Sequence, residues 1–186
     1  MAAVYVGCLS PNFSLLDGST GNIIQLSQFR GRKVWIAFFR FATCPFCIIR
    51  LREMIEKYGN NYEIQILVIF QSPVEHMKKT ICQLKSPFPL LSDSKQAIYK
   101  IYHVQTSYLS YFLYSWSCCW IRSAYSYPNT LPKVEPQGDL GRLPSDFLID
   151  ETGKIKDIFR AKHIHQHIPF HRVDHFICPK DAFVGI

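Results

Sequence analysis

Apolar residues gather along this chain in two nearly continuous runs, with a stretch of helical spacing between them. The runs are Val34–Arg40 and Glu63–Phe70, and uninterrupted apolar sequence of this length is typical of strands buried on both faces. Between them, Pro45–Tyr58 places its apolar side chains on one helical stripe, and Gly59 follows as a stop. The pattern predicts a strand, a helix and a second strand in succession.

The rest of the pattern continues the alternation of strands and helices and ends in a strand pair. Ser72 and Pro73 open a helix that we expect to reach Leu84, because a serine cap followed by proline is a common helix start. Further predicted elements are extended pieces at 13–17 and 87–91, a helix at 94–102, strands at 146–150 and 154–160 joined by a tight turn, and a last helix from about 169. This order predicts one α/β domain, residues 1–186, whose central mixed sheet is flanked by helices.

Residues 105–141 interrupt the alternation, and we interpret them as an insertion within the domain. Their first part, 108–121, is aromatic and nearly uncharged, while their second part carries Pro128, Pro132 and Pro136 and predicts a loop. The aromatic part is shorter than the roughly 20 residues that a membrane-spanning helix needs. Three interpretations stay open: a helix packed on the core, an exposed apolar patch for dimerisation or partner docking, and a membrane-surface segment.

Composition and charge narrow the class of protein. The 186 residues are 48% hydrophobic and 19% charged, which is typical of one globular domain. The net charge of +7 is scattered along the chain, so we expect no nucleic-acid partner. Met1–Ser10 lacks the order of a secretory signal, and the seven cysteines are an odd number. We therefore expect a cytoplasmic protein in which a close cysteine pair is catalytic or metal-binding rather than structural.

Cys44 and Cys47 form such a pair in the stretch Thr43-Cys44-Pro45-Phe46-Cys47. The pair follows a predicted buried strand and opens a predicted helix, with Pro45 in the first turn, where proline is favoured. The free N–H groups and positive end of the helix dipole stabilise a thiolate, so we expect a lowered pKa for Cys44. Cys44 is then the nucleophile, and Cys47, one turn later, closes a disulfide with it. Candidates for additional positive potential are the nearby arginines, Arg40, Arg50 and Arg52.

The residues alone leave other roles open for this cysteine pair. A structural zinc site needs a second ligand pair at suitable spacing, and the later cysteines do not supply one: Cys82, Cys118, Cys119 and Cys178. His171 and His175 share a predicted helix face that could bind metal, but they lie far along the chain. Another alternative is that the two cysteines are buried and inert. If Cys47 alone were inert, Cys82 or Cys119 would be the resolving cysteine that closes a disulfide with Cys44. We expect a redox role with no metal and no cofactor.

A second signal is Leu143-Pro144, directly before the predicted strand at 146–150. Together with the cysteine pair, these residues resemble the bacterial peroxiredoxin-like proteins of the AhpC/TSA type in the thioredoxin superfamily. The segments that carry the resemblance are 39–47, 70–73, 87–93, 143–150 and 167–169. The resemblance implies a thioredoxin-like fold, thiol-dependent redox activity and a cis-proline loop at Leu143 and Pro144 that faces the cysteines. The site residues that it implies for substrate binding are Thr43, Pro45, Leu143 and Pro144, with Arg142 as electrostatic support.

One departure from the family pattern bears on the substrate. Typical peroxiredoxins carry Pro-x-x-x-Thr/Ser-x-x-Cys, whereas here, counted from Thr43, Phe39 stands at the proline position and Phe46 at the cysteine position. The sequence therefore favours dithiol–disulfide exchange over peroxide reduction. Further expectations are an antioxidant role, a thioredoxin- or glutathione-type reductant and a homodimer. A hypothesis of a different class is a redox-regulated binding protein that docks a partner through residues 108–121.

Overall fold

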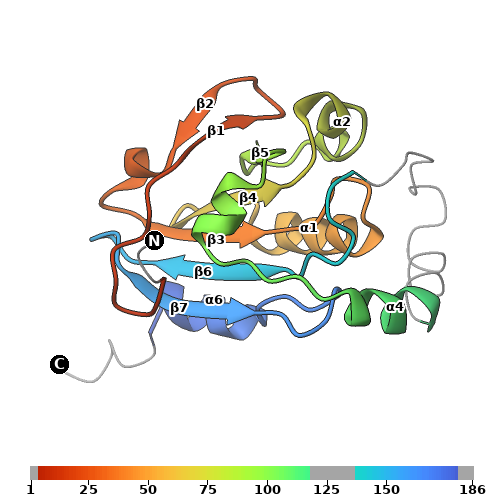
Figure 1. The fold of residues 1–186 in the computed structure, drawn as a ribbon. Coiled ribbons are helices and arrows are strands. Elements are labelled where there is room, and N and C mark those ends of the chain that lie inside the picture. Colours follow the sequence, from red (N-terminus) through yellow and green to blue (C-terminus); the bar gives the residue numbers. More distant parts are fainter. Residues whose placement is uncertain (1–3, 118–136, 180–186) are drawn as a thin grey trace.

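The computed structural model describes residues 4–117 and 137–179, which form a seven-stranded sheet with helices on both faces (Figure 1). The strand order is β2-β1-β5-β4-β3-β6-β7. The strands are β1 Ser14–Asp17, β2 Ile23–Gln25, β3 Lys33–Phe38, β4 Ile64–Phe70, β5 Leu90–Ser92, β6 Ser145–Ile149 and β7 Ile155–Arg160. β3, β4 and β5 run parallel, and the other neighbours pair antiparallel. The predicted α/β class with a mixed sheet is confirmed.

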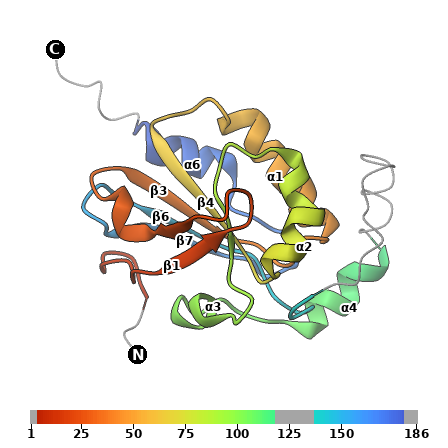
Figure 2. The same ribbon diagram turned by 90° about the horizontal axis from the view of Figure 1, so that it is seen from above.

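Helices cover the two faces of the sheet unequally (Figure 2). The helices are α1 Pro45–Tyr58, α2 Val74–Lys79, α3 Ala97–Ile101, α4 Tyr108–Ser117 and α6 Phe170–Ile177, with short 3-10 turns η1 Leu26–Phe29 and η2 Ile81–Leu84. α1, α2 and α6 contribute to one apolar cluster, while α3 and the N-terminal segment contribute to the other. Because β3 lies between these clusters, alternate side chains along it enter opposite layers of core.

Two predicted helices differ from those observed, and polar side chains explain both differences. The single helix expected from Ser72 to Leu84 is split at Thr80, whose hydroxyl donates to the His76 carbonyl at 2.7 Å. Such a bond back to the preceding turn competes with regular helix geometry. The helix expected at 94–102 begins later, because the Asp93 carboxylate accepts the N–H groups that open α3.

The expectation of a cis peptide bond at Leu143-Pro144 is wrong. No peptide bond within residues 4–117 and 137–179 is cis, so Leu143-Pro144 is trans. The trans form of an X–Pro bond is favoured by about 0.5–1 kcal/mol when its surroundings impose nothing else. Here the trans loop is anchored on both sides, by Leu143 N–H to the Gln105 carbonyl at 3.0 Å and by Ala161 N–H to the Pro144 carbonyl at 3.1 Å.

The aromatic stretch begins with a helix, α4, that presents most of its described side chains to solvent. Tyr108, Leu109, Phe112 and Leu113 are 62%, 71%, 76% and 59% exposed, whereas Tyr111 packs against the core cluster around α1. Among the interpretations of this stretch, the exposed apolar patch fits these residues. Residues 118–136 of the predicted insertion, including its prolines, lie outside the described residues. No helix in the described part of the chain is long and apolar enough to cross a membrane.

Candidate active site

Cys44 lies where β3 leaves the sheet and α1 begins. The last pair between β3 and β6 is at Phe38, so the chain is free to turn after that residue. Two hydrogen bonds hold the turn: Ala42 N–H donates to Ser72 Oγ at 2.9 Å, and Cys44 N–H donates to the Phe41 carbonyl at 2.9 Å. Cys44 is the N-cap residue of α1, at the positive end of the helix dipole.

Cys44 combines complete burial with stabilisation of its negative charge. Burial on its own raises the pKa of Cys44, but a hydrogen bond from the Cys47 thiol and the charge of Arg40 outweigh it. The Arg40 Nη1 atom lies 3.2 Å from Cys44 Sγ. Together these effects lower the pKa of Cys44 from 9.0 to about 6. At neutral pH Cys44 is therefore mostly a thiolate, which is the nucleophilic form of cysteine.

Cys47 is equally buried but has the opposite tendency. Its Sγ accepts the backbone N–H of Arg40 at 3.4 Å. Burial, followed by the hydrogen bond to Cys44 and the charge of that thiolate, raises the pKa of Cys47 well above 9.0. The pair therefore holds one thiolate and one thiol. The described cysteines are all free thiols: Cys8, Cys44, Cys47, Cys82 and Cys178.

Arg40 also covers Cys44. Its Nη2 atom donates to the Leu140 carbonyl, and its guanidinium lies over the Phe41 ring at 4.9 Å and over the Tyr111 ring at 5.8 Å. Only 2% of Arg40 is exposed, so its charge is little screened by water and acts strongly on the sulfur. The described ends of the insertion thus hold the arginine that contacts Cys44.

Two other arginines named from the sequence are held elsewhere. Arg50 donates to the Ile168 carbonyl and lies 3.7 Å from the centre of the Phe170 ring. Arg142 donates to the Val104 carbonyl at 2.8 Å and to Gln96, and it lies over the ring of Tyr99. Arg142 therefore joins α3 to the loop before β6, while Arg40 is the arginine that the structure brings to the cysteines.

The four residues expected to bind substrate surround the pair at different depths. Thr43 and Pro45, on either side of Cys44, are half-buried and reach the surface. Leu143 is buried in the same apolar cluster as Cys44, and Pro144 is buried beside it. Thr43 and Pro45 are therefore the two of these residues that solvent reaches, while Cys44 itself is completely buried.

Two histidines, His165 and His167, lie against the active-site turn, and the second belongs to the segment 167–169 that carries the family resemblance. The ring of His165 lies 5.8 Å from that of Phe46, and the ring of His167 lies 4.7 Å from that of Phe39. Burial, then the charges of Arg50, His165 and Arg40, lowers the pKa of His167 well below 6.5, so it is neutral. No group of three or more His, Cys, Asp or Glu residues in the described part of the chain could hold a metal ion.

Asp146 on β6 is a second buried acid near the site, and sequence reasoning missed it. Its carboxylate accepts Trp35 Nε1–H at 2.9 Å and Ile168 N–H at 3.1 Å. Burial raises the pKa of Asp146 to about 6, although the charge of Arg50 and these two hydrogen bonds oppose the shift. The sequence of β6 contains the aspartate but does not indicate its burial, because burial of a single aspartate depends on partners from distant segments.

Two comparisons with known proteins bear on this arrangement. The sequence profile of the AhpC/TSA family matches residues 6–158, which includes both cysteines and six of the strands completely. No curated protein matches the sequence of the chain.

Solved structures resemble the chain in fold at low sequence identity. A peroxiredoxin-like protein from Aquifex aeolicus has a TM-score of 0.69 and 13% identity, over 95% of this chain and 88% of that one. Peroxidoxin BcpB from Mycobacterium tuberculosis has a TM-score of 0.60 and 18% identity, over 98% and 99%. The thioredoxin domain of a thiol-disulfide oxidoreductase from Bacteroides vulgatus has a TM-score of 0.59 and 18% identity, over 94% and 99%. At such identities these likenesses establish a thioredoxin-like fold, as the sequence predicted.

Proposed function

This chain belongs to the AhpC/TSA family, and from that premise we propose that Cys44 is its nucleophile and Cys47 its resolving cysteine. The family makes the protein a thiol-dependent oxidoreductase, as the resemblance in sequence implied. The observation that supports the assignment of roles is the contact of 3.2 Å between Arg40 Nη1 and Cys44 Sγ. Together with the hydrogen bond from the Cys47 thiol, it stabilises a thiolate on Cys44, while burial and that thiolate keep the proton on Cys47.

The proposed reaction is a two-step exchange. The Cys44 thiolate attacks one sulfur of a substrate disulfide, so that a mixed disulfide forms and the other substrate sulfur leaves as a thiolate. Cys47 then loses its proton to solvent and attacks Cys44 Sγ, which breaks the mixed disulfide and releases the second substrate thiolate. The substrate has gained two electrons, and the enzyme holds a Cys44–Cys47 disulfide. A thioredoxin- or glutathione-type reductant supplies two electrons to restore it.

The substrate that we propose is a disulfide rather than a peroxide. Counted from Thr43, Phe39 stands at the proline position of the peroxide-site pattern. Counted back from Cys44, Ala37 and Phe41 stand at the proline and Thr/Ser positions, so neither count supplies the pattern.

The buried ring of Phe39 packs against Phe70 and His167. This corner of the site is therefore filled by aromatic rings. Insulin reduction in the presence of a thioredoxin-type recycling system tests the proposal, and we expect steady turnover. Stopped-flow mixing of the reduced protein with hydrogen peroxide is the counter-test, because consumption much faster than that of a free thiol would make it a peroxidase.

The setting that we propose is a single domain, residues 1–186 with an insertion at 105–141, acting as an antioxidant enzyme in the cytoplasm. Five described cysteines are free thiols, which suits a reducing compartment. Fractionation of cells that produce the tagged protein, with trapping of its thiol state, checks this setting.

A second candidate function is a redox-regulated binding protein, and the exposed face of α4 favours it. Leu109 and Phe112 are among its most exposed apolar residues, and exposed apolar patches mark sites of association. In this case α4 binds a partner or forms a homodimer, and turnover is negligible. The double variant Leu109→Ser, Phe112→Ser separates the two functions. Unchanged insulin reduction supports the enzyme, whereas negligible turnover by the unaltered protein together with lost association would favour the binding protein.

A further inference from the structure

One peptide group connects a buried tyrosine to Cys47. The Phe39 carbonyl accepts the hydroxyl of Tyr99 at 2.7 Å. The N–H on the other side of the same peptide bond belongs to Arg40 and donates to Cys47 Sγ at 3.4 Å. Tyr99 O–H, the Phe39–Arg40 peptide and Cys47 Sγ thus form a continuous chain of hydrogen bonds.

We propose that Tyr99 is a positioning residue for the resolving step, acting on Cys47 through the Phe39–Arg40 peptide. The inference rests on the proposed function, in which Cys47 closes the disulfide. A hydrogen bond accepted by a carbonyl polarises its peptide group and strengthens donation by the N–H of that group. A stronger N–H donor stabilises the thiolate that Cys47 must become before it attacks Cys44.

The location of this peptide explains why a side chain is needed there. Pairing between β3 and β6 ends at Phe38, so the Phe39 carbonyl has left that side of the sheet. A buried carbonyl without a partner is unfavourable, and Tyr99 supplies one. Its hydroxyl also lies 2.8 Å from the Ile69 carbonyl of β4, so its single proton is shared between the two carbonyls and ties the end of β4 to the turn that carries Arg40.

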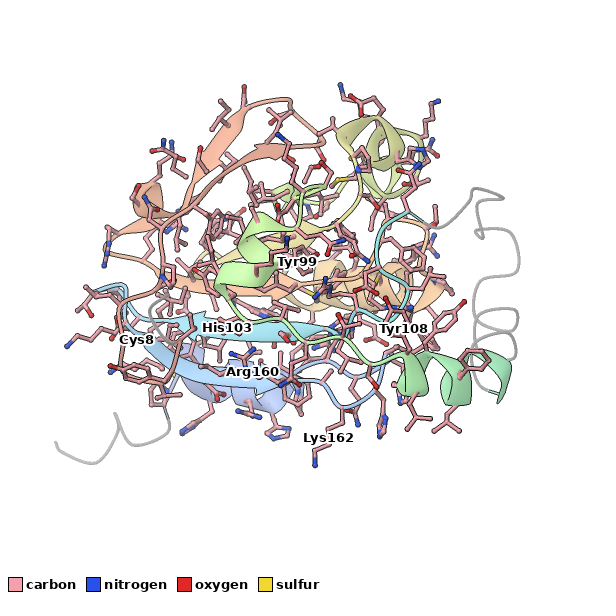
Figure 3. All side chains as sticks on the ribbon, viewed as in Figure 1. Cys8, Tyr99, His103, Tyr108, Arg160 and Lys162 are labelled. Atoms are coloured by element: carbon pink, nitrogen blue, oxygen red, sulfur yellow. The ribbon has the colours of Figure 1, made fainter. Side chains whose placement is uncertain are left out.

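Tyr99 is itself held rigidly in one orientation. It is completely buried on α3 (Figure 3), and its N–H donates to the carboxylate of Asp93 at 3.1 Å. Its ring meets Phe38 edge to face at 5.1 Å, and the Arg142 guanidinium lies over its ring at 5.3 Å. Burial, then the charge of Asp93, raises the pKa of Tyr99 well above 10.0, so the hydroxyl keeps the proton that it donates.

The chain of bonds separates the two steps of the exchange. The two cysteines contact different groups of Arg40: its guanidinium lies against Cys44 Sγ, whereas its backbone N–H donates to Cys47 Sγ. The guanidinium charge also lowers the pKa of Cys47, but the hydrogen bond from Tyr99 acts on the backbone group. Loss of the Tyr99 hydroxyl should therefore leave the first attack intact and slow the closing of the disulfide.

The test compares Tyr99→Phe with the matched variant Tyr102→Phe. Tyr102 is a buried tyrosine next to α3 whose hydroxyl bonds Ser10 Oγ and the Pro11 carbonyl, each at 2.7 Å, away from the cysteines. The probe is an aromatic disulfide that releases one coloured thiolate when Cys44 attacks and a second when Cys47 displaces it. We expect the first release to change less than twofold in both variants. The second should slow about fivefold to tenfold in Tyr99→Phe only, with its pH profile displaced to higher pH.

Each outcome bears on a different claim. Equal second-step rates and pH profiles in the two variants would overturn the role of Tyr99 while leaving the roles of the cysteines intact. Equal slowing in both variants would assign the effect to general loosening of α3, which also overturns the inference. An unaltered protein that releases only one thiolate and forms no Cys44–Cys47 disulfide, as mapped by mass spectrometry, would instead overturn the proposed function.

Discussion

Two buried acids beside α1, Cys44 and Asp146, respond to burial in opposite ways. Both are almost entirely withdrawn from water, and each lies near an arginine. Yet the pKa of Cys44 falls to about 6, while the pKa of Asp146 rises to about 6. Because burial disfavours the charged form of both groups, the difference must come from their partners.

The arginines are used differently in the two regions. Arg40 places its Nη1 atom directly against Cys44 Sγ, whereas Arg50 directs its guanidinium to the Ile168 carbonyl and to Glu53. At Cys44 the hydrogen bond from the Cys47 thiol and the contact with Arg40 together outweigh burial, whereas at Asp146 the charge of Arg50 and two hydrogen bonds do not. The protein thus stabilises a charge at the proposed reactive sulfur and disfavours one at Asp146.

The largest expected effect comes from removing the reactive groups themselves. Cys44→Ser should abolish disulfide reduction, because serine at this position does not form the nucleophilic anion at neutral pH. Cys47→Ser should keep the first attack and accumulate a mixed disulfide with the substrate. Product release and intact-protein mass measure the two results. Normal turnover by either variant would contradict the two-cysteine mechanism.

The next largest effect comes from removing the contact that distinguishes the two acids. Arg40→Met keeps much of the buried apolar stem but loses the charge, so the pKa of Cys44 should return toward 9.0. The thiolate fraction at pH 7, and with it the rate of the first attack, should fall by about 10- to 100-fold. Thiolate absorbance during a pH titration measures the shift.

Arg50→Met is the control for that variant, since Arg50 lies on the same helix as Cys47 but its charge lowers the pKa of Asp146. It should leave the pKa of Cys44 near 6 and raise that of Asp146 further. Equal shifts of the Cys44 pKa in the two variants would show that the net charge of the region matters, rather than the contact.

The sequence could predict the position of Cys44 because local rules determine it. A continuous apolar run predicted β3, proline in the first turn predicted the start of α1, and Gly59 predicted its end, so the bounds of α1 match the prediction. The hairpin of β6 and β7 was predicted for the same reason, since its turn residues are contiguous in the chain.

Features that depend on distant partners could not be predicted. Three arginines near the cysteines were equal candidates in the sequence, and Arg40 is distinguished only by the Leu140 carbonyl and the rings that hold it. β2, three residues long, was missed because only its pairing with β1 defines it. The trans bond at Pro144 and the hydrogen bond from Tyr99 to the Phe39 carbonyl likewise depend on contacts between separate segments.

A smaller effect should appear in the pH dependence of stability, with opposite signs for the two acids. The folded pKa of Cys44 lies below its ordinary value of 9.0, so its stabilisation is complete above pH 9 and is lost as pH falls toward 6. The folded pKa of Asp146 lies above its ordinary 3.8, so its stabilisation is present below pH 3.8 and is lost as pH rises toward 6. The summed contribution of these two acids to the free energy of unfolding should therefore be lowest near pH 6, whereas buried neutral His167 opposes the Asp146 contribution below pH 6.5.

Urea titrations at a series of pH values measure each contribution as the difference in free energy of unfolding between a variant and the unaltered protein, with an expected slope of about 1 kcal/mol per pH unit. The difference for Asp146→Asn should change between pH 3.8 and 6, and that for Cys44→Ala between pH 6 and 9. A profile that neither variant alters would show that the two buried acids are not the source of the dependence.

The smallest effect asks whether the contact of Arg40 with Cys44 depends on its aromatic support. Tyr111 on α4 lies 5.8 Å from the Arg40 guanidinium, and such a contact contributes about 0.5–2 kcal/mol. Because Phe41 and the Leu140 carbonyl still hold Arg40, Tyr111→Leu should raise the pKa of Cys44 by less than about one unit. Phe112→Leu, the exposed neighbour on the same helix, should leave that pKa unchanged. If both variants raised it equally, α4 would act on Cys44 as a whole rather than through the ring that meets Arg40.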